Sequence, residues 1–490
     1  MTIEQIIEQV SKSQPSTDTK LIREAYVFAV AAHGEQKRKS GELYIQHPLN
    51  TAFILAQIKA DLPTIMAGLL HDVPEDTTKT LEDIKNIFGE EVAKLVEGIT
   101  KLSKIRYRGI KRYRESLRKM FLAMAEDLRV ILIKFADRLH NLRTLEALPK
   151  EKQKRIAQET LEIYAPIAGL LGIWSLRWQM EDICFKYLQP EDYRKLEYKY
   201  EIERKAELNQ YIEKIKQIVN KKLNEEKINH EISGRFKHLY SIYQKMQEKN
   251  RQFDEIYDVF ALRIVVDNVA DCYKTLGIVH SIWKPNYNRF KDYIAVPKPN
   301  GYRSIHTTVF GPEGRPTEFQ IKTKEMYEES LYGISAHWYY KQKRADEQEK
   351  APHWVQEILE VQREAKNSQE FLKEVKLDIF KDRIFVFTPK GDVYDLPSDA
   401  TPVDFAYGVH TDIGNKCVSA RINNNMAALD TLLKNGDMVE IITDANRAGP
   451  NYDWLKFVKT RRARTKIIEY AKRSRLDTIK RFIPGFKKDH

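Results

Sequence analysis

The sequence predicts a multidomain chain, in which an all-helical domain is followed by a mixed α/β domain and then by a small β-rich module. Up to about residue 195, apolar residues recur at helical spacing, as in LIREAYVFAVAAH and EEVAKLVEGITKL. After about residue 250, short β-branched or aromatic runs such as DVFALRIVV and TEFQIKT are separated by turn residues such as PKPNG. With 490 residues and 42% hydrophobic content, the chain can build several packed cores.

The changes of pattern along the chain divide it into five segments. The Lys- and Glu-rich stretch from about 200 to 250 predicts helix, and KDYIAV and SIHTTVF predict further strands. DRIFVFTPKGDVYDLP predicts a β-hairpin that turns at Lys390 and Gly391, and FVKTRRARTKIIEYAKR predicts a basic helix. The segments are an all-helical domain (1–195), an α/β domain (196–342), a linker helix (343–380), a β-rich module (381–446) and a basic helical tail (447–490).

The composition narrows the class of protein. A net charge of +12, from 82 Lys and Arg against 70 Asp and Glu, favours polyanionic partners such as nucleotides, RNA or the ribosome. The three cysteines lie far apart without CxxC spacing, which argues against a disulfide framework and against a cysteine-rich zinc site. The first twenty residues lack the features of a signal peptide, and no stretch is apolar for long enough to span a bilayer. We therefore expect a cytoplasmic protein without a membrane partner.

A group of ionisable residues follows a run of leucines in LLHDVPEDTT. On a helix, Glu75 lies one turn from His71 and Asp76 one turn from Asp72, so that the four side chains share one face. A face so rich in carboxylates is costly to bury without a cation. The stretch therefore suggests a cation site.

Two further stretches supply candidate ligands. In IKFADRLHNLRT, Asp137, Asn141 and Thr144 recur at helical spacing behind the apolar run VILI. In YIQHP, His47 precedes a proline, where we expect helix geometry to be interrupted and the imidazole to be aimed inward. A His-Asp pair that stood alone would more often be a structural hydrogen bond. Together the stretches offer a mixed nitrogen and oxygen set suited to a divalent transition metal: His47, His71, Asp72 and Asp137.

This combination resembles the HD-type metal-dependent phosphohydrolases. The flanking sequence segments RKSG, YIQHP and ADRLHNLRT narrow the resemblance to the hydrolase domain of the RelA/SpoT homologue family, which degrades the alarmone (p)ppGpp. The resemblance implies that Glu75 and Asp76 position or deprotonate the attacking water. It implies a manganese ion (Mn²⁺) held by His47, His71, Asp72 and Asp137. It also implies that the guanine nucleotide is gripped by Arg38, Lys39, Ser40, Asn141 and Thr144.

The chain departs from this family pattern near the cluster. Leu43 stands where the family usually has a proline, and Pro74 stands where it usually has an aliphatic residue. Because proline lacks a backbone donor, we expect Pro74 to break or kink the helix between the His-Asp pair and the Glu-Asp pair.

A second polar set lies in the α/β domain. In a strand over SIHTTVF, Tyr302 and His306 share a face, and a strand over TEFQIKT places Glu318, Gln320 and Lys322 on one face. A solvated outer sheet face would show the same alternation. The adjacent strand candidate DVFALRIVV begins at Asp258, whose carboxylate could share a magnesium ion (Mg²⁺) with Glu318. The cations and donors that could meet phosphates are Arg235, Lys237, Lys245, Lys291, Lys298 and Asn300.

The segments KHLYSIYQKM, YDVFALRI and RFKDYIAVPKPNGYRSIHT resemble the synthetase domain of the same family. The resemblance implies a nucleotidyltransferase-like α/β fold for this domain. The resemblance implies that Tyr302 stacks on the guanine of GDP or GTP. It implies that Glu318 activates the 3′-hydroxyl that attacks the β-phosphate of ATP, in a transfer that Asp258 and Glu318 serve with Mg²⁺. The phosphates would be held by Arg235, Lys237, Lys245, Lys291, Lys298 and His306. The sequence RFKD has a basic form here, and the HDxxED motif is intact. By the same resemblance, both features indicate an enzyme with two activities.

The third resemblance lies in the β-rich module, where DFAYGVHTDIG and NGDMVEI are similar to the TGS domain, a small β-grasp module. The resemblance implies contact with the ribosome and with the 3′ end of deacylated tRNA, through His410. A strand-end histidine satisfied within the fold is the alternative. The basic helix that follows could contact rRNA or be simply solvated.

The three resemblances indicate a bifunctional alarmone enzyme of the stringent response. It would transfer pyrophosphate from ATP to GDP or GTP and would hydrolyse (p)ppGpp back to GDP or GTP and pyrophosphate. One alternative is a hydrolase whose synthetase fold only senses nucleotides. The other is a non-catalytic regulator that binds tRNA or the ribosome. Since simultaneous synthesis and hydrolysis only consume ATP, we expect the two sites to be coupled reciprocally through the charged helices between them.

Overall fold

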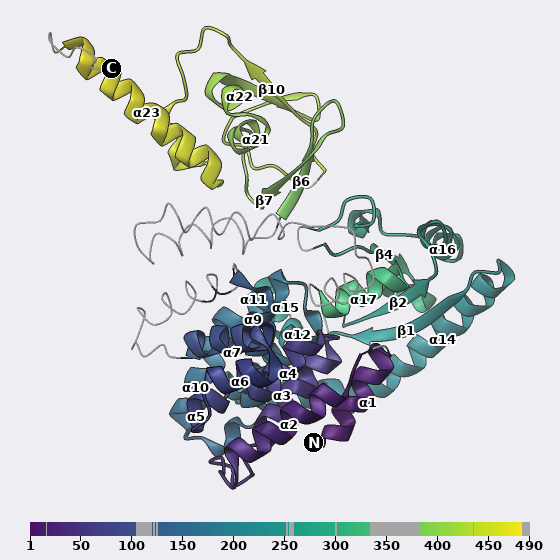
Figure 1. Ribbon diagram of the computed structural model, residues 1–490. Coiled ribbons are helices and arrows are strands. Elements are labelled where there is room, and N and C mark those ends of the chain that lie inside the picture. The colour runs from purple at the N-terminus through teal and green to yellow at the C-terminus, as the bar shows by residue number, and fades with distance from the viewer. Residues whose placement is uncertain are drawn as a thin grey trace. The chain divides into compact units, whose positions relative to one another are not determined.

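The computed structural model describes residues 1–15, 17–103, 120, 123, 126–250, 253, 259–298, 301–333, 383–434 and 436–482 (Figure 1). The chain divides into two compact units, residues 1–351 and 352–490, and each is described by itself. The segment expected to form the linker helix, 343–380, lies outside the described residues.

The N-terminal part of the first unit is helical, as its apolar spacing predicts. Asp61 and Asp127 accept backbone N–H bonds at the N-termini of two of its helices. Its first helices are α1 (Ile3–Ser13), α2 (Lys20–His33), α3 (Gln46–Gln57), α4 (Leu62–Leu70), α5 (Val73–Asp76), α6 (Leu81–Phe88), α7 (Glu90–Ser103) and α9 (Leu128–Arg143). The next are α10 (Lys150–Glu159), α11 (Ala165–Leu170), α12 (Trp174–Leu188), α13 (Pro190–Tyr198) and α14 (Lys205–Glu225). Short π-helical turns at Thr160–Tyr164 and Lys199–Arg204 join some of them.

A five-stranded sheet with strand order β1-β2-β5-β4-β3 forms the second half of this unit. Its strands are β1 (His230–Phe236), β2 (Phe260–Val266), β3 (Lys291–Asp292), β4 (Ile305–Phe310) and β5 (Pro316–Thr323). Strands β2 and β5 are parallel, and the other neighbours are antiparallel. The helices that accompany the sheet are α15 (Leu239–Lys249), α16 (Val269–Ile282) and α17 (Lys324–Tyr332).

The alternation along β5 assigns its two faces as the sequence predicts. Phe319 and Ile321 enter a hydrophobic core shared with residues of α14 and α16. Gln320 and Lys322 point to the opposite face, where they line a pocket together with side chains of α12. The polar face is therefore covered by a helix from the N-terminal part and is not an open, solvated surface.

Two details of the sheet differ from the expectation. The stretch from about 200 to 250 was expected to be helical, but His230–Phe236 forms the edge strand β1, paired with β2. Its side chains are only half-buried and its neighbours are rich in charge, so the alternation is too weak to be recognised. KDYIAV contributes only the two-residue strand Lys291–Asp292.

The second unit begins with the expected hairpin, in which β6 (Arg383–Phe387) pairs antiparallel with β7 (Val393–Pro397). Gly391 adopts φ 91° at its turn, a conformation in which glycine carries no steric penalty. The helices α21 (Pro402–Val409) and α22 (Thr411–Lys416) follow. A three-stranded sheet is made of β8 (Cys417–Ile422), β9 (Asn425–Ala427) and β10 (Val439–Thr443).

The expected basic helix is α23 (Arg461–Phe482), and its first part belongs to the core of this unit. Ala463 and Ile467 pack with Val403 and Tyr407 of α21. The buried carboxylate of Asp404 on α21 accepts bonds from the backbone N–H groups of residues 459 and 460 just before α23. The start of the basic segment is therefore fixed to the module rather than being a free tail.

Two compositional expectations can be compared with the structure. The three cysteines are free and buried, and the sequence had argued against a disulfide framework. Among the described residues, none of the helices combines the length and the apolar character that crossing a bilayer requires.

Candidate functional site

Residues from three separate helical segments converge in the N-terminal half. His47 lies in the first turn of α3, His71 is the C-cap of α4, and Asp137 lies on α9. One ligand atom of each lies within 4.8 Å of the other two, and all three residues are buried. Asp72 joins them, since its carboxylate oxygens lie 3.2 Å from His71 Nε2 and 3.4 Å from His47 Nε2. The structure thus brings the four predicted metal ligands together.

The helix near this cluster is broken, as the presence of Pro74 predicts. The helix ends at Leu70, and Asp72 is the N-cap of the next short helix, so the break falls at the His-Asp pair itself. Pro74 stands in the first turn of α5, where a backbone donor is not required. The break is therefore confirmed, but its expected position after the pair was wrong. His47 also lies within a helix, because Pro48 occupies a first-turn position and does not interrupt α3.

The imidazoles of the cluster are oriented by bonds on their far sides. His71 Nδ1 lies 2.9 Å from the carbonyl oxygen of Gly68, so Nδ1 carries the proton. Its Nε2 is buried and lacks a partner in hydrogen-bond geometry within the described residues, although Asp72 is close. A buried imidazole nitrogen with a free lone pair beside two carboxylates suits a divalent cation. The donor set therefore fits a metal ion.

The charges near the cluster keep its carboxylates ionised. Burial alone would raise the pKa of Asp137, but the ammonium of Lys134 and the neighbouring imidazole of His47 hold it well below its usual value. Burial likewise opposes ionisation of Asp72, and the nearby His71 and His47 lower its pKa. Lys134 Nζ lies 2.7 Å from Asp137 Oδ2. Ionised carboxylates are the form that binds a cation.

The two acids expected to handle water lie at the rim of the cluster. Tyr44 Oη lies 2.6 Å from Asp76 Oδ2 and 3.0 Å from Asp72 Oδ2, and so links the metal set to Asp76. Although Glu75 as a whole is exposed, local burial of its carboxyl, followed by repulsion from Asp72, raises its pKa. A carboxyl with a raised pKa exchanges protons more readily near neutral pH.

Beside the cluster lies a cavity of about 430 Å³. All five residues expected to grip a guanine nucleotide line it, and Arg38 Nη2 donates to Asn141 Oδ1 at 2.7 Å. Its charged lining residues are all cationic, which suits a polyphosphate. The predicted lining residues are Arg38, Lys39, Ser40, Asn141 and Thr144, and the sequence analysis missed Lys37, Tyr44, Arg138 and Lys152.

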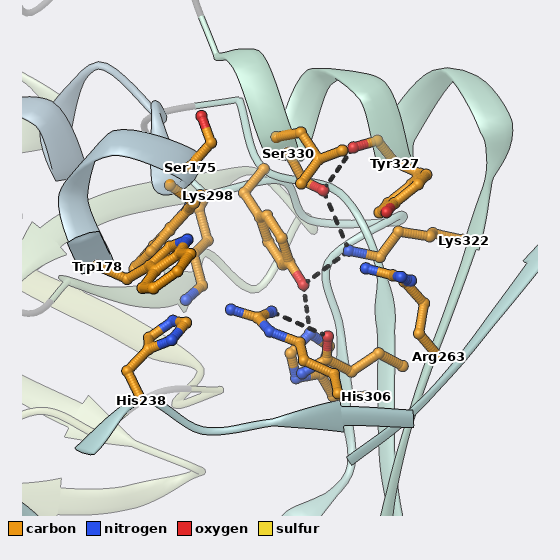
Figure 2. Close-up of a pocket in the computed structure, with 14 residues that line it drawn as sticks. Ser175, Trp178, His238, Arg263, Lys298, His306, Lys322, Tyr327 and Ser330 are labelled. Carbon is orange, nitrogen blue, oxygen red and sulfur yellow. Dashed lines mark hydrogen bonds between the residues drawn. The ribbon is translucent and has the colours of Figure 1, made fainter. Parts of the chain in front are cut away.

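A second pocket, of about 260 Å³, lies between the polar face of the sheet and α12 (Figure 2). Trp178 of α12 stacks on His238, with ring centroids 4.6 Å apart, opposite the side where Arg263 and Lys322 lie. Four of the predicted residues line it: Arg235, Lys298, Tyr302 and His306. The sequence analysis missed Trp174, Ser175, Trp178, His238, Arg263, Tyr327, Ser330 and Leu331.

Glu318 lies at the edge of this second pocket. Its Oε1 lies 3.4 Å from His306 Nδ1 and accepts a bond of 3.0 Å from Gln320 Nε2. Burial would raise the pKa of Glu318, but the bond from His306 and the charge of Lys237 lower it to about 2. The carboxylate is thus ionised at neutral pH and can accept a proton.

The remaining predicted residues lie apart from the pocket lining. Lys291 is exposed and pairs across the strands with His306. Lys237 Nζ lies 3.9 Å from Glu318 Oε2, and Lys245 lies on α15. Two predicted residues, Asp258 and Asn300, lie outside the described residues.

In the second unit, His410 stands at the start of α22. Its side chain is 64% exposed, and its Nδ1 accepts the backbone N–H of Asp412 at 3.2 Å. The imidazole therefore caps a helix and still presents its other nitrogen to solvent.

Gln320 and Lys322 also line the second pocket, and the alternation along TEFQIKT had already placed both on the polar face with Glu318. One missed residue of the first site had a signal in the sequence. His140, whose Nδ1 lies 2.7 Å from His47 Nδ1, follows Asp137 by three residues on α9. The α12 residues had no such signal, because only tertiary packing brings that helix to the sheet.

Three family profiles match the chain. They are described as "HD domain" over residues 25–174, "Region found in RelA / SpoT proteins" over residues 234–345 and "TGS domain" over residues 384–443. The first covers the metal-ligand cluster, and the second covers most of the sheet with its pocket.

The chain is also similar over most of its length to named proteins. It is 46% identical to the guanosine-3′,5′-bis(diphosphate) 3′-pyrophosphohydrolase of Aquifex aeolicus, over 96% of this chain and 67% of that protein. It is 48% identical to a probable enzyme of the same name from Synechocystis, over 93% of this chain and 61% of the relative. It is 47% identical to the bifunctional (p)ppGpp synthase/hydrolase SpoT of Escherichia coli K12, over 94% of this chain and 66% of the relative. The chain thus spans roughly three-fifths to two-thirds of the length of these relatives.

Proposed function

The chain belongs to the RelA/SpoT family, and from this membership we propose that it both makes and degrades (p)ppGpp. The observation that carries the proposal is the presence, in one compact unit, of two cationic pockets with different chemistry. One lies beside a buried set of metal-ligand type, and the other lies beside an ionised glutamate on a sheet. Two pockets of this kind suit two opposite reactions on one guanine nucleotide.

The proposed hydrolysis takes place at the first pocket. A divalent ion, proposed to be Mn²⁺, held by His47, His71, Asp72 and Asp137, would lower the pKa of a water and offset negative charge on the leaving pyrophosphate. Glu75 and Asp76 take the proton of the attacking water. The water oxygen bonds to the phosphorus that carries the 3′ oxygen, and the bond between that phosphorus and the 3′ oxygen breaks. The 3′ oxygen leaves with the bonding electrons and takes up the proton from these carboxyl groups, so that GDP or GTP and pyrophosphate are released. The cationic lining that includes Arg38 and Lys39 holds the nucleotide.

The proposed synthesis takes place at the second pocket. Guanine stacks on Tyr302, and cations including Arg235 and Lys298 hold the phosphates of ATP and of GDP or GTP. Mg²⁺, held by Asp258 and Glu318 in this proposal, would offset phosphate charge during transfer. Glu318 accepts the proton of the 3′-hydroxyl.

The proposal for the second unit concerns partners. The exposed ring nitrogen of His410 and the basic sequence of α23 support binding of deacylated tRNA on the ribosome, in the cytoplasm. Binding would be expected to weaken steeply as salt concentration rises.

A paired assay on the purified chain tests the two activities. One arm supplies ATP and GDP with Mg²⁺, the other supplies ppGpp with Mn²⁺, and nucleotides are separated in both. Turnover in both arms is expected, since Pro74 stands where the structure of α5 tolerates it.

Two single variants make the assay site-specific. Asp72→Asn is expected to abolish hydrolysis and spare synthesis, and Glu318→Gln is expected to do the reverse. Synthesis without hydrolysis in the wild type would contradict the proposal for the first pocket, and hydrolysis alone would support a synthetase fold that only senses nucleotides. Turnover in neither arm, with deacylated tRNA still bound, would favour a non-catalytic regulator.

A further inference from the structure

Lys322 is a buried cation in an unusual environment. The residue is 1% exposed, on the polar face of β5. Within the described part of the chain, its amino group has no carboxylate partner, and three other cations lie nearby: Arg235, Arg263 and Lys298. A buried charge without a counterion is costly, so such a residue is more readily explained by a task in the pocket than by stability.

The contacts of Lys322 lead step by step to Glu318. Lys322 Nζ donates to Tyr302 Oη at 3.2 Å and lies 3.5 Å from Ser330 Oγ (Figure 2). Tyr302 Oη lies 2.8 Å from His306 Nε2. His306 Nδ1 lies 3.4 Å from Glu318 Oε1. The four side chains form one continuous chain of polar contacts across the pocket.

The ammonium favours one direction of donation along this chain. A charged lysine can only donate, so one lone pair of the Tyr302 oxygen accepts from it, and the hydroxyl proton is left to point to His306 Nε2. Burial raises the pKa of Tyr302 to about 12, so the hydroxyl retains this proton. His306 Nε2 therefore accepts, and the proton of the neutral imidazole is left on Nδ1, facing Glu318.

We propose that Lys322 is a positioning residue for synthesis, which acts through Tyr302 and His306 to orient the carboxylate of Glu318. The inference rests on the proposed function, because it needs Glu318 as the base. It adds a residue that does not itself contact the reacting atoms. It also gives Tyr302 a second task beside stacking on guanine.

The arrangement at Glu318 selects one of its oxygens for the reaction. Oε1 already accepts from Gln320 Nε2 and faces His306 Nδ1, whereas Oε2 has Lys237 at 3.9 Å. Oε2 therefore takes the proton of the 3′-hydroxyl. The 3′ oxygen bonds to the β-phosphorus of ATP, the bond from that phosphorus to the oxygen bridging to the α-phosphorus breaks, and AMP leaves with the bonding electrons.

The charge on Lys322 is itself sensitive to pH. Burial, followed by repulsion from Arg235, Arg263 and Lys298, lowers the pKa of Lys322 to about 7. A neutral amine has a lone pair that can accept from Tyr302, so the direction of the chain is no longer fixed as pH rises through about 7. The titratable and charged groups that face Lys322 or its partners are Arg235, Arg263, His238, Lys298, Tyr302, His306, Glu318 and Tyr327.

The first test is Lys322→Met, which removes the donor but keeps an unbranched side chain. Because a hydrogen bond to a charged group is lost, kcat for synthesis is expected to fall about 10- to 100-fold with KM for GDP nearly unchanged. Lys324→Met is the matched control, since Lys324 is 67% exposed and pairs with Asp267 outside the pocket. A loss confined to KM would overturn the proposal, because Lys322 would then only support the stacking ring.

The second test is rescue by Lys322→Arg, whose guanidinium donates at every accessible pH. Synthesis is expected to return, and the decline of wild-type kcat/KM above about pH 7 is expected to disappear. Identical pH profiles for Lys322→Arg and wild type would contradict the role of the charge. A wild type that makes no (p)ppGpp would instead refute the proposed function, and the two failures are therefore distinguishable.

Discussion

At the scale of single residues, both histidines of the metal-ligand cluster have their tautomers fixed from outside it. Arg38 Nη1 lies 3.4 Å from His140 Nδ1, and because arginine only donates, this nitrogen of His140 accepts. His47 Nδ1, 2.7 Å away, must then carry a proton, which leaves its Nε2 free to face the carboxylates. Bonds of this kind orient imidazole ligands and set their basicity.

Substitution of His71 by Asn tests the cluster directly. The amide can keep the bond to Gly68 but lacks a nitrogen at the place of Nε2. Affinity for Mn²⁺, measured by electron paramagnetic resonance titration, is expected to fall by more than about 100-fold, beyond the loss for an outer-shell change. Hydrolysis should disappear with it, while synthesis remains.

The control is His230→Asn on the edge strand β1. His230 bonds to Ile228 and Asn220 and lies in another part of the fold. Its substitution should leave binding of Mn²⁺ intact. Undiminished binding in His71→Asn would show that the cluster is a hydrogen-bonded core and not a metal site.

At the scale of elements, the C-terminus of α17 is held against the turn before α12. Gly333 adopts φ 53°, and a Cβ there would lie 2.3 Å from the carbonyl oxygen of Leu171. Because α17 supplies Tyr327 and Ser330 to the second pocket, this close approach also positions pocket residues.

The close contact at Gly333 predicts that two glycine substitutions destabilise the fold to different extents. Gly314→Ala also places alanine at a positive φ, of 72°, but nothing lies within 4 Å of its Cβ. It should lower the free energy of unfolding by about 1–2 kcal/mol from backbone strain alone. Gly333→Ala should lower the free energy of unfolding by about 1–3 kcal/mol more than Gly314→Ala, since the backbone of residues 171 and 172 must move. Urea unfolding followed by fluorescence compares them, and equal losses would argue against tight packing at Gly333.

At the scale of the whole molecule, one helix connects the surroundings of both pockets of the first unit. Helix α12 packs against α9, which carries Asp137 and Asn141, and against α15 and α17. The same helix lines the second pocket through Trp174, Ser175 and Trp178. A shift of α12 would therefore change both sites.

This arrangement supports the expected reciprocal coupling. A non-hydrolysable ppGpp analogue in the first pocket should change the dissociation constant of GDP at the second by about 5- to 150-fold, the usual range for coupled sites. GDP should change the affinity for the analogue by the same factor. Isothermal titration with and without the other ligand measures both quantities.

Arg38→Ala provides the control, because it weakens binding of the analogue at the first pocket without altering the lining of the second. The effect on GDP should then vanish. Equal GDP affinities with and without the analogue in the wild type would mean that the two sites act independently.

Much of the fold and of the candidate sites could be predicted from sequence, because local patterns encode them. The alternation along β5, the helical spacing around Asp137 and the hairpin at Gly391 all form as expected. The edge strand β1 was missed, since a half-buried strand with charged neighbours has little alternation to recognise. The position of the break near Pro74 was also misjudged, because a proline tolerated in a first turn does not fix where the preceding helix ends.

The sequence by itself identified most of the side chains proposed to carry the chemistry: the His and Asp ligands, some of the cations of both pockets and the acid on β5. Spacing within one element fixes which residues share a face, and that information is local. Only the tertiary structure decided that α12 closes the second pocket, that His140 supports His47 and that Lys322 reaches Glu318 through two other side chains. These relations join residues far apart in the chain or on different elements, and packing of the folded cores alone brings them within hydrogen-bond distance.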